Sequence, residues 1–365
     1  MPVPSQPPAR ARAIGFAPGV LPPGPLNAIT DVAGVRVGQI TVHEGEATRT
    51  GVTAILPHRE NPFTHRVPAA VFTMNGFGKM AGVTQVQELG ELETPVVLTN
   101  TLAVGRAVEA VVDWTLAQPG NERVRSVNAL VGETNDGRLN DIRRRGVTAE
   151  HVSQAMASAT DGPVAEGCVG AGTGTVAFGW KGGIGTASRM LPASYGGWTV
   201  GATVQANYGG ALTMDGLPVG RLLRRFYLSD HLPQAADADG SVIVVLATDA
   251  PLSDRNLHRL ARRAMAGIAR TGAAFSDGSG DYAIAFATHP GVIRTPERRA
   301  AMASVADWPN DRMSPLFVAA IEATEEAALN ALTTATTTET RLDGRRVVVP
   351  ALPLEQVLAL RAGRG

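Results

Sequence analysis

The residue pair with the clearest chemical potential is Gly240-Ser241, which joins a polar, turn-rich segment to an apolar run at residues 242–247. A strand that opens with Gly-Ser can expose the Gly240 carbonyl to the Ser241 hydroxyl. Attack by this hydroxyl gives an ester through an N-to-O acyl shift, and hydrolysis of the ester frees the Ser241 amine. An α-amine has an unperturbed pKa near ~8, so it can accept the hydroxyl proton of its own residue near neutral pH. The simpler alternative is a Gly-Ser turn before a strand, and composition does not decide between the two.

Several well-known catalytic motifs are absent from the sequence. It contains no Gly-x-Ser-x-Gly nucleophile elbow, no His-Glu-x-x-His zinc helix and no Gly-x-x-x-x-Gly-Lys-Ser/Thr phosphate loop. The run GAGTGT at residues 170–175 resembles a dinucleotide fingerprint, but its third glycine comes one residue too early and a strand-like run follows it. We interpret this run as a tight turn that another backbone segment approaches. The seven histidines share no ligand spacing and are interpreted as surface or structural residues, so no metal and no organic cofactor are expected.

Composition narrows the classes of partner. The 365 residues include 33 basic and 33 acidic side chains, so neither nucleic acid nor an anionic membrane is an expected partner. The single cysteine, Cys168, excludes an intramolecular disulfide framework. No stretch of about 18 apolar residues occurs, and prolines and arginines interrupt the N-terminal segment where a signal peptide would be apolar. These features predict a cytoplasmic protein.

Alternating strands and helices must position any site. Short apolar runs bounded by Gly, Asn or Pro predict strands at residues 69–73, 95–98, 127–131, 175–178, 199–205, 242–247 and 281–287. Apolar residues at helical spacing predict helices at residues 102–116, 148–159 and 315–332. The last of these helices has one apolar face, made of Phe317, Ala320, Ile321, Ala328 and Leu332. A further helix begins after Ser253 and ends at Gly272. The Pro-rich residues 1–30 are expected to form an extended arm that becomes ordered from about residue 24.

Six segments in order carry a resemblance to one enzyme family. They are residues 34–38 (GVRVG), 75–78 (NGFG), 132–142 (GETNDGRLNDI), 204–209 (VQANYG), 240–252 (GSVIVVLATDAPL) and 278–282 (GSGDY). Together they resemble the L-aminopeptidase/D-esterase–amidase family, which includes the β-peptidyl aminopeptidases. Six segments in one order are far more specific than any one of them. The resemblance runs from about residue 34 to 282, and neither the arm before it nor the C-terminal part after it carries a matching segment.

The resemblance implies a fold and a maturation step. Members of this family are precursors that cleave themselves before a serine, and both fragments stay in a folded heterodimer that assembles further. Their fold is a four-layer α/β/β/α sandwich, similar in architecture to N-terminal-nucleophile hydrolases but differently connected, and the alternation of strands and helices is compatible with it. For this chain, the resemblance implies one catalytic domain over residues 1–365, fragments 1–240 and 241–365 after cleavage, and a homo-oligomer of processed heterodimers.

The resemblance also implies catalytic roles. Ser241 is expected to be the nucleophile of both self-cleavage and acyl transfer, and Asn207 to donate its side-chain amide to the oxyanion. Ser279 and Asp281 are expected to orient Ser241 or its amine, and their alternate positions put them on one face of a strand. The acidic residue is aspartate here, whereas glutamate is expected in the β-peptidyl branch. The aspartate side chain is shorter, so the structure must show whether it reaches Ser241. An Asp that only caps a strand-opening turn is the alternative.

Substrate binding is expected in the 132–142 segment. By resemblance, Glu133 receives the free ammonium of the substrate, because a carboxylate is the simplest selector for an N-terminal amine. Asn135 stands where some members carry a tyrosine that assists the reaction, and its role here stays open. The alternative for the whole segment is an acidic loop, since Asp136-Gly137 is a turn signal.

Together these inferences predict a serine N-terminal-nucleophile amidohydrolase. It would release N-terminal residues from short peptides, amides or esters that carry a free amino group, through an acyl-enzyme. One alternative is an acyltransferase similar to the ornithine acetyltransferases, which use a threonine at the position of Ser241. Another is a non-catalytic binding protein on the same scaffold. The choice among L-α, D-α and β residues depends on pocket walls that the sequence does not reveal.

Overall fold

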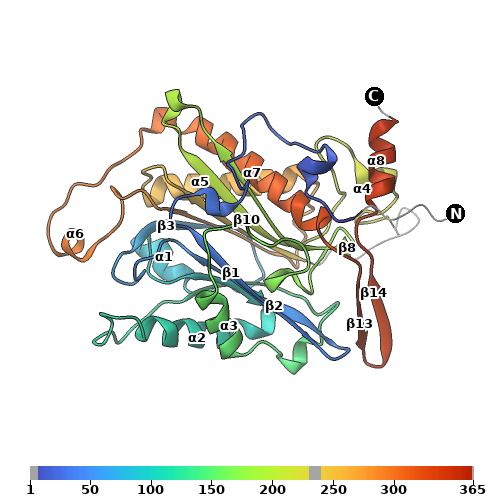
Figure 1. Ribbon diagram of the computed structural model, residues 1–365, viewed down its shortest axis with the longest axis horizontal. Coiled ribbons are helices and arrows are strands. Elements are labelled where there is room, and N and C mark those ends of the chain that lie inside the picture. The colour runs from blue at the N-terminus through green and yellow to red at the C-terminus, as the bar shows by residue number, and fades with distance from the viewer. Residues whose placement is uncertain (1–6, 230–239, 364–365) are drawn as a thin grey trace.

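Two β-sheets lie face to face in the computed structural model, which describes residues 7–229 and 240–363 (Figure 1). The larger sheet has six strands in the order β4 (Glu91–Leu92), β3 (Val67–Gly76), β12 (Gly280–Ala287), β11 (Ser241–Thr248), β10 (Thr199–Asn207) and β9 (Gly183–Met190). The smaller sheet has four strands in the order β1 (Arg36–Glu44), β2 (Thr48–Leu56), β5 (Val96–Asn100) and β6 (Leu130–Thr134).

Helices cover the outer face of each sheet. Helices α5 (Asp254–Arg270) and α7 (Ser314–Thr333) pack on the larger sheet, and α2 (Val104–Leu116) and α3 (Ala149–Ala157) pack on the smaller one (Figure 1). The remaining elements are α1 (Val83–Leu89), α4 (Val219–Leu222), α6 (Pro296–Ala300), α8 (Leu354–Ala362), the pair β7 (Val176–Ala177) and β8 (Trp180–Lys181), and the hairpin of β13 (Thr338–Leu342) and β14 (Arg345–Val349). The layers follow the order α/β/β/α, so the predicted four-layer sandwich is confirmed.

The side-chain alternation in β12 shows why the layers pack in this way. Its large residues Tyr282, Ile284 and Phe286 join the apolar core between the two sheets. The alanines at 283, 285 and 287 join the second core, under α5 and α7, where small side chains allow the helices to approach closely. The predicted division of this strand into a large face and an alanine face is confirmed.

Two expectations about the ends of the chain need correction. The predicted face of α7 is confirmed for Ala320, Ala328 and Leu332, which are buried, whereas Phe317 and Ile321 are only partly buried. From residue 322 onward α7 is buried almost all round, because the N-terminal arm covers its outer side. Arg12 pairs with Glu326 at 2.7 Å, and Glu326 also accepts from the fully buried Arg189 at 2.7 Å. From residue 7 onward the arm is therefore packed and contains a helical turn, Ala11–Ile14, rather than being uniformly extended.

The strand register places four residues side by side at one edge of the larger sheet. Gly76 at the end of β3 pairs with Gly280, Gly280 pairs with Ser241, and Ser241 pairs with Asn207 at the end of β10. Strands β11 and β12 run parallel to each other and antiparallel to their outer neighbours. The starts of two strands and the ends of two others therefore meet in one row, and this row positions the site.

Candidate active site

Ser241 is the first residue of β11 and is 7% exposed. Its Oγ accepts a hydrogen bond from the Gly280 N–H at 3.2 Å, which holds the hydroxyl against the neighbouring strand. Gly240 packs closely against the end of β10. A Cβ at this position would lie 2.2 Å from the Asn207 carbonyl oxygen and 2.6 Å from Tyr208 Cα. The bond between Gly240 and Ser241 is therefore held in a position that only glycine permits on its amino side.

Asn207 faces Ser241 across the antiparallel pair, and two hydrogen bonds orient its amide. Oδ1 accepts from the Val176 N–H at 2.9 Å, and Nδ2 donates to the Asn135 carbonyl oxygen at 3.1 Å. An amide nitrogen carries two hydrogens. The second hydrogen has no acceptor among the described residues, so the side chain can donate it to a negatively charged oxygen.

Ser279 and Asp281 form a hydrogen-bonded pair beside β11. The Ser279 hydroxyl donates to Asp281 Oδ1 at 2.6 Å, which places both side chains together although β12 itself begins at Gly280. Asp281 Oδ1 also accepts from the Val242 N–H at 3.2 Å. Burial raises the pKa of Asp281, and the hydrogen bond from Ser279 opposes this effect. The shorter aspartate thus reaches the nucleophile's strand, one residue beyond Ser241.

Glu133, near the end of β6, presents a buried carboxylate to the same row. Oε1 accepts from the Lys79 N–H at 2.8 Å, and Oε2 accepts from the Thr101 hydroxyl. A Cβ on Gly78 would lie 3.2 Å from this Oε1 and 2.9 Å from Gly280 Cα, so the carboxylate lies next to the residue that binds Ser241 Oγ. No lysine, arginine or histidine of the described ranges forms an ion pair with Glu133. A substrate ammonium can take that place.

Asn135 joins the site through its main chain. Its side chain is exposed and accepts from the Gly137 N–H at 2.9 Å, which is the turn geometry expected of an Asx residue. Its carbonyl oxygen, by contrast, holds Asn207. The structure therefore pairs Ser241 with Asn207 directly, places Glu133 beside them through Gly78 and Gly280, and connects Asn135 through its backbone.

Two residues for which sequence reasoning assigned no role support this arrangement. The Asn75 amide donates to Asp281 Oδ2 at 3.3 Å and to the Ser276 carbonyl oxygen at 2.9 Å. The Tyr282 hydroxyl donates to the Gly78 carbonyl oxygen at 2.9 Å and so fixes the turn beside Glu133. Both residues lie within the resembling segments 75–78 and 278–282, which was the signal that could have identified them.

Asp136, which follows Asn135, is a buried carboxylate behind the site. Its Oδ1 accepts from the Asn140 amide at 3.0 Å, and its Oδ2 has no hydrogen-bond partner among the described residues. Burial raises the pKa of Asp136 to about 6, and hydrogen bonds from Thr50 and Asn140 offset only part of this effect. The carboxylate helps to hold the loop that carries Asn135.

The glycine run at residues 170–175 is a tight turn, as interpreted from the sequence. A Cβ on Gly172 would lie 2.3 Å from the Ile184 backbone nitrogen, and one on Gly174 would lie 2.2 Å from the Arg49 carbonyl oxygen. Neighbouring backbone thus fills the space that a bound phosphate would need. Within residues 7–229 and 240–363, no group of three or more His, Cys, Asp or Glu side chains could hold a metal ion, and no helix is long and apolar enough to span a membrane.

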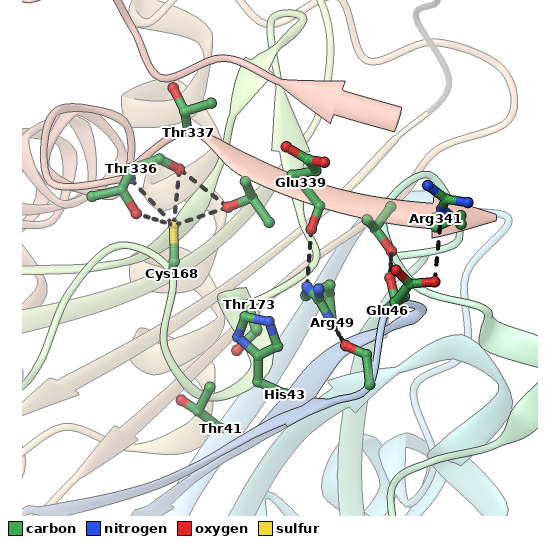
Figure 2. A pocket seen from close by; sticks show the side chains of 13 residues that line it. Thr41, His43, Glu46, Arg49, Cys168, Thr173, Thr336, Thr337, Glu339 and Arg341 are labelled. Carbon is green, nitrogen blue, oxygen red and sulfur yellow. Dashed lines mark hydrogen bonds and ion pairs between the residues drawn. The ribbon is translucent and has the colours of Figure 1, made fainter. Parts of the chain in front are cut away.

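A separate cavity of about 590 Å³ contains none of the predicted site residues. It lies between β13 and residues of β1 and β2, and Figure 2 shows Cys168 at one side with Thr336 beside its sulfur. The Thr338 hydroxyl lies 3.7 Å from the same sulfur. Burial opposes ionisation of Cys168, but the charge of Lys181 and hydrogen bonds from Thr336 outweigh it and lower the thiol pKa. The single cysteine is half-buried and lines a cavity that does not include Ser241.

Comparison with known proteins agrees with this geometry. The model of peptidase family S58 matches residues 27–347, which extends well beyond the segment 34–282 and includes α7. The beta-peptidyl aminopeptidase BapA of Sphingosinicella microcystinivorans is 42% identical over 349 residues, covering 90% of this chain and 86% of that protein.

Solved structures show the same similarity over nearly the whole chain. A beta-aminopeptidase from a Burkholderia species superposes with a TM-score of 0.85 at 43% identity and covers 98% of both chains. The L-aminopeptidase D-Ala-esterase/amidase of Ochrobactrum anthropi, described as a prototype serine aminopeptidase and a variant of the Ntn hydrolase fold, superposes with a TM-score of 0.87 at 39% identity, covering 98% of this chain and 99% of that one. The chain belongs to peptidase family S58 and is an aminopeptidase of the N-terminal serine nucleophile type.

Proposed function

We propose that the chain cleaves itself between Gly240 and Ser241 and that Ser241 is then the nucleophile that removes N-terminal residues from short peptides, amides or esters. The observation that carries this proposal is the row at the sheet edge. In this row Ser241 Oγ touches Gly280, faces Asn207 across the strand pair, and lies beside the turn that contacts Glu133. A nucleophile, an oxyanion donor and a carboxylate selector are the three groups that an aminopeptidase of this type requires.

Self-cleavage follows from the position of the hydroxyl. Ser241 Oγ attacks the Gly240 carbonyl carbon, the Gly240–Ser241 C–N bond breaks, and the nitrogen takes up the hydroxyl proton to become the Ser241 α-amine. Water then hydrolyses the ester that joins the Gly240 carbonyl to Ser241 Oγ. The products are fragment 1–240 with a terminal carboxylate and fragment 241–365 with a free amine next to a free hydroxyl.

Turnover uses the same groups again. The Ser241 α-amine accepts the hydroxyl proton while Oγ attacks the substrate carbonyl, and the second Asn207 N–H stabilises the developing oxyanion. The leaving amine departs with a proton, and water releases the N-terminal residue from the acyl-enzyme. We assign Ser279 and Asp281 to positioning, because Asp281 binds the Val242 N–H and so holds the start of β11.

Glu133 supplies selectivity for a free amine. Its carboxylate already accepts two hydrogen bonds, yet no described cation balances its charge. A substrate ammonium restores that balance, whereas an acylated amine does not. The names of the Sphingosinicella and Burkholderia relatives point to β residues, and the name of the Ochrobactrum enzyme points to L-amino acids and D-Ala derivatives. The proposal therefore specifies an N-terminal residue with a free amine, and experiment decides its backbone class.

The decisive experiment is a denaturing gel of the purified protein with N-terminal sequencing of the fragments. We expect two bands, the smaller beginning Ser-Val-Ile-Val. Ser241→Ala should remain whole and should not hydrolyse an aminoacyl p-nitroanilide. Ser253→Ala is the matched control, because Ser253 precedes α5 without a side-chain cap hydrogen bond and should be cleaved normally. A folded wild-type protein that stays whole, or a fragment that begins elsewhere, would remove the support for Ser241.

Assembly and location belong to the same proposal. The processed heterodimer is proposed to form a homo-oligomer, which light scattering of the purified protein tests directly. A cytoplasmic location remains a prediction from composition, which fractionation of the source cells would check.

A further inference from the structure

A small cavity of about 50 Å³ lies on the Asn207 side of the site. Its walls come from the 135–138 segment, from residues 176–179 and from residues 207–209. Arg138 forms part of the wall, its side chain is exposed, and it makes no ion pair or hydrogen bond to any described residue. A cavity of this size holds a group of a few heavy atoms, since a water molecule occupies about 30 Å³ in the liquid.

A second guanidinium adds positive charge to this cavity. Arg225 donates to the carbonyl oxygen of Gly179, which lines the cavity, and its guanidinium lies 5.1 Å from the centre of the Trp180 ring. Arg225 itself is not part of the lining, but its acceptor Gly179 is. No carboxylate of the described ranges pairs with either arginine. The cavity therefore has positive charge in its wall and beside it that no described carboxylate balances, and an anion suits it.

The segment from Glu133 to Arg138 runs across the row of strand ends. Glu133 lies on the β12 side, next to Gly78 and Gly280, whereas the Asn135 carbonyl binds Asn207 on the β10 side. Neighbouring strands are about 4.8 Å apart, so the distance across β12, β11 and β10 is about 10 Å. An extended peptide advances by at most about 3.5 Å per residue. Three extended residues span about 10 Å, and two span about 7 Å, to which a hydrogen bond of about 2.8 Å at each end adds the remainder. A di- or tripeptide therefore fits between the ammonium partner and the cavity, with Ser241 between them.

We propose that Arg138 binds the C-terminal carboxylate of the substrate, so that the preferred substrates are di- and tripeptides with both ends free. The inference rests on the proposed function, because it takes Ser241 as nucleophile and Glu133 as ammonium partner. A guanidinium matches a carboxylate in charge and in bidentate geometry. Arg225 is held in place by the Gly179 carbonyl oxygen and the Trp180 ring and contributes positive charge. Arg138 has no ion-pair partner among the described residues and can therefore bind the substrate carboxylate.

The test compares three substrates on the processed enzyme: a dipeptide, the same dipeptide as its C-terminal amide, and an aminoacyl p-nitroanilide that has no carboxylate. The free dipeptide should have a kcat/KM at least about tenfold above that of its amide, as expected for hydrogen bonds to a charged group. Arg138→Ala should abolish this preference through a rise in KM for the free dipeptide. The amide and the anilide should change less than about twofold, and Arg138→Lys should restore part of the preference.

The control is Arg143→Ala, because Arg143 is exposed in the same loop region and lines no part of the cavity. Equal rates for the free dipeptide and its amide on the wild-type enzyme would overturn the inference without any variant, as would a preference that survives in Arg138→Ala. In both cases turnover of the anilide would leave the proposed function intact. Absence of cleavage and of anilide turnover in the wild type would instead overturn the proposed function, and this inference with it.

Discussion

Asn207 lies directly opposite Ser241 in the antiparallel pairing of β10 with β11, so that the last residue of one strand faces the first residue of the next. Both strands are central in the six-stranded sheet and are flanked by paired strands on either side. The ladder of backbone hydrogen bonds therefore sets the distance between Asn207, the proposed oxyanion donor, and Ser241, the proposed nucleophile. A site on central strands needs little further ordering when a substrate binds.

This pairing predicts the effect of Asn207→Asp. The aspartate keeps an oxygen that can accept from the Val176 N–H but loses the amide hydrogens that face the oxyanion. We expect kcat to fall by about 10²–10³, the usual cost of losing one oxyanion donor, and self-cleavage to slow as well. The measurement is anilide turnover per mole of cleaved protein, with the thermal midpoint recorded beside it. A purely structural role would lower the midpoint and leave kcat of the folded enzyme nearly unchanged.

The close approach at Gly240 predicts that Gly240→Ala impairs cleavage. The added Cβ meets the Asn207 carbonyl oxygen and Tyr208 Cα, neither of which can move without disturbing β10. We expect a destabilisation of about 1–3 kcal/mol and a larger uncleaved fraction on a gel. Gly105→Ala in α2 is the matched control, because a Cβ there has no neighbour within 4 Å. Cleavage of both variants at the wild-type rate would show that the close contact between Gly240 and the end of β10 is not needed for self-cleavage.

Glu133→Gln tests the selector for the free amine. The substitution removes the charge while an oxygen can still accept from the Lys79 N–H. We expect kcat/KM for a free dipeptide amide to fall. The loss should correspond to roughly 2–4 kcal/mol of transition-state stabilisation, which is the cost of removing one partner of a buried charge pair. Self-cleavage should continue, since the Gly240–Ser241 bond carries no free ammonium.

The matching substrate test needs no variant. N-acetylation of the dipeptide amide should abolish turnover by the wild-type enzyme, because the substrate loses its charge and Glu133 is left without a counter-ion. Equal rates for the free and acetylated substrates would show that Glu133 is only an acid of the loop.

The buried Asp136 predicts a pH dependence of stability. Its pKa is raised to about 6 in the folded protein, whereas an unfolded aspartate titrates near ~4. The folded state therefore binds the proton more tightly, and its stability falls as pH rises from about 4 to about 6. The Asp136→Asn variant has no carboxylate at this position and should not lose stability over this pH range. The free energy of unfolding of the variant minus that of the wild type should therefore be up to about 3 kcal/mol larger above pH 6 than at pH 4.

Thermal unfolding of the two proteins at pH 4, 5, 6 and 7.5 measures this difference. Asp307→Asn is the control, because Asp307 is exposed. A difference between wild type and Asp136→Asn that stays constant over this range would contradict the assignment.

Cys168 predicts that thiol and serine reagents act differently. Its sulfur lines a cavity away from Ser241, and its thiol pKa is lowered, so a thiol reagent should label it at neutral pH. We expect labelling without loss of anilide turnover, whereas a serine-directed sulfonyl fluoride should inactivate the cleaved enzyme. Mass spectrometry of the labelled fragments checks both modifications. Inactivation in proportion to labelling of Cys168 would argue against Ser241 as nucleophile.

Local pattern predicted the long helices and most of the central strands, but it missed the strands at residues 36–44, 48–56 and 183–190. The alternation in residues 281–287 predicted a strand with one alanine face, because side chains along a strand alternate between two environments. The pair Ser279 and Asp281 likewise met as their spacing required. The Gly-Ser junction alone left a nucleophile and a simple turn as alternatives, and the resemblance of the surrounding segments favoured the nucleophile. The predicted face of α7 is only part of its buried surface, because the N-terminal arm that covers another side comes from the other end of the chain.

The sequence by itself determined which residues are candidates for chemistry and where most of the helices and central strands lie, since both depend on side-chain type and short-range spacing. Only the tertiary structure decided that Glu133 of one sheet lies beside Gly280 of the other, and that Asn135 contributes its carbonyl rather than its side chain. Likewise, the role of Asn75 appears only when its amide meets Asp281. These contacts join residues far apart in the chain, and they exist because the two sheets pack face to face around one apolar core. No local pattern in the sequence shows which strands become neighbours. The strand order within each sheet and the packing of the two sheets therefore decide which of these residues meet.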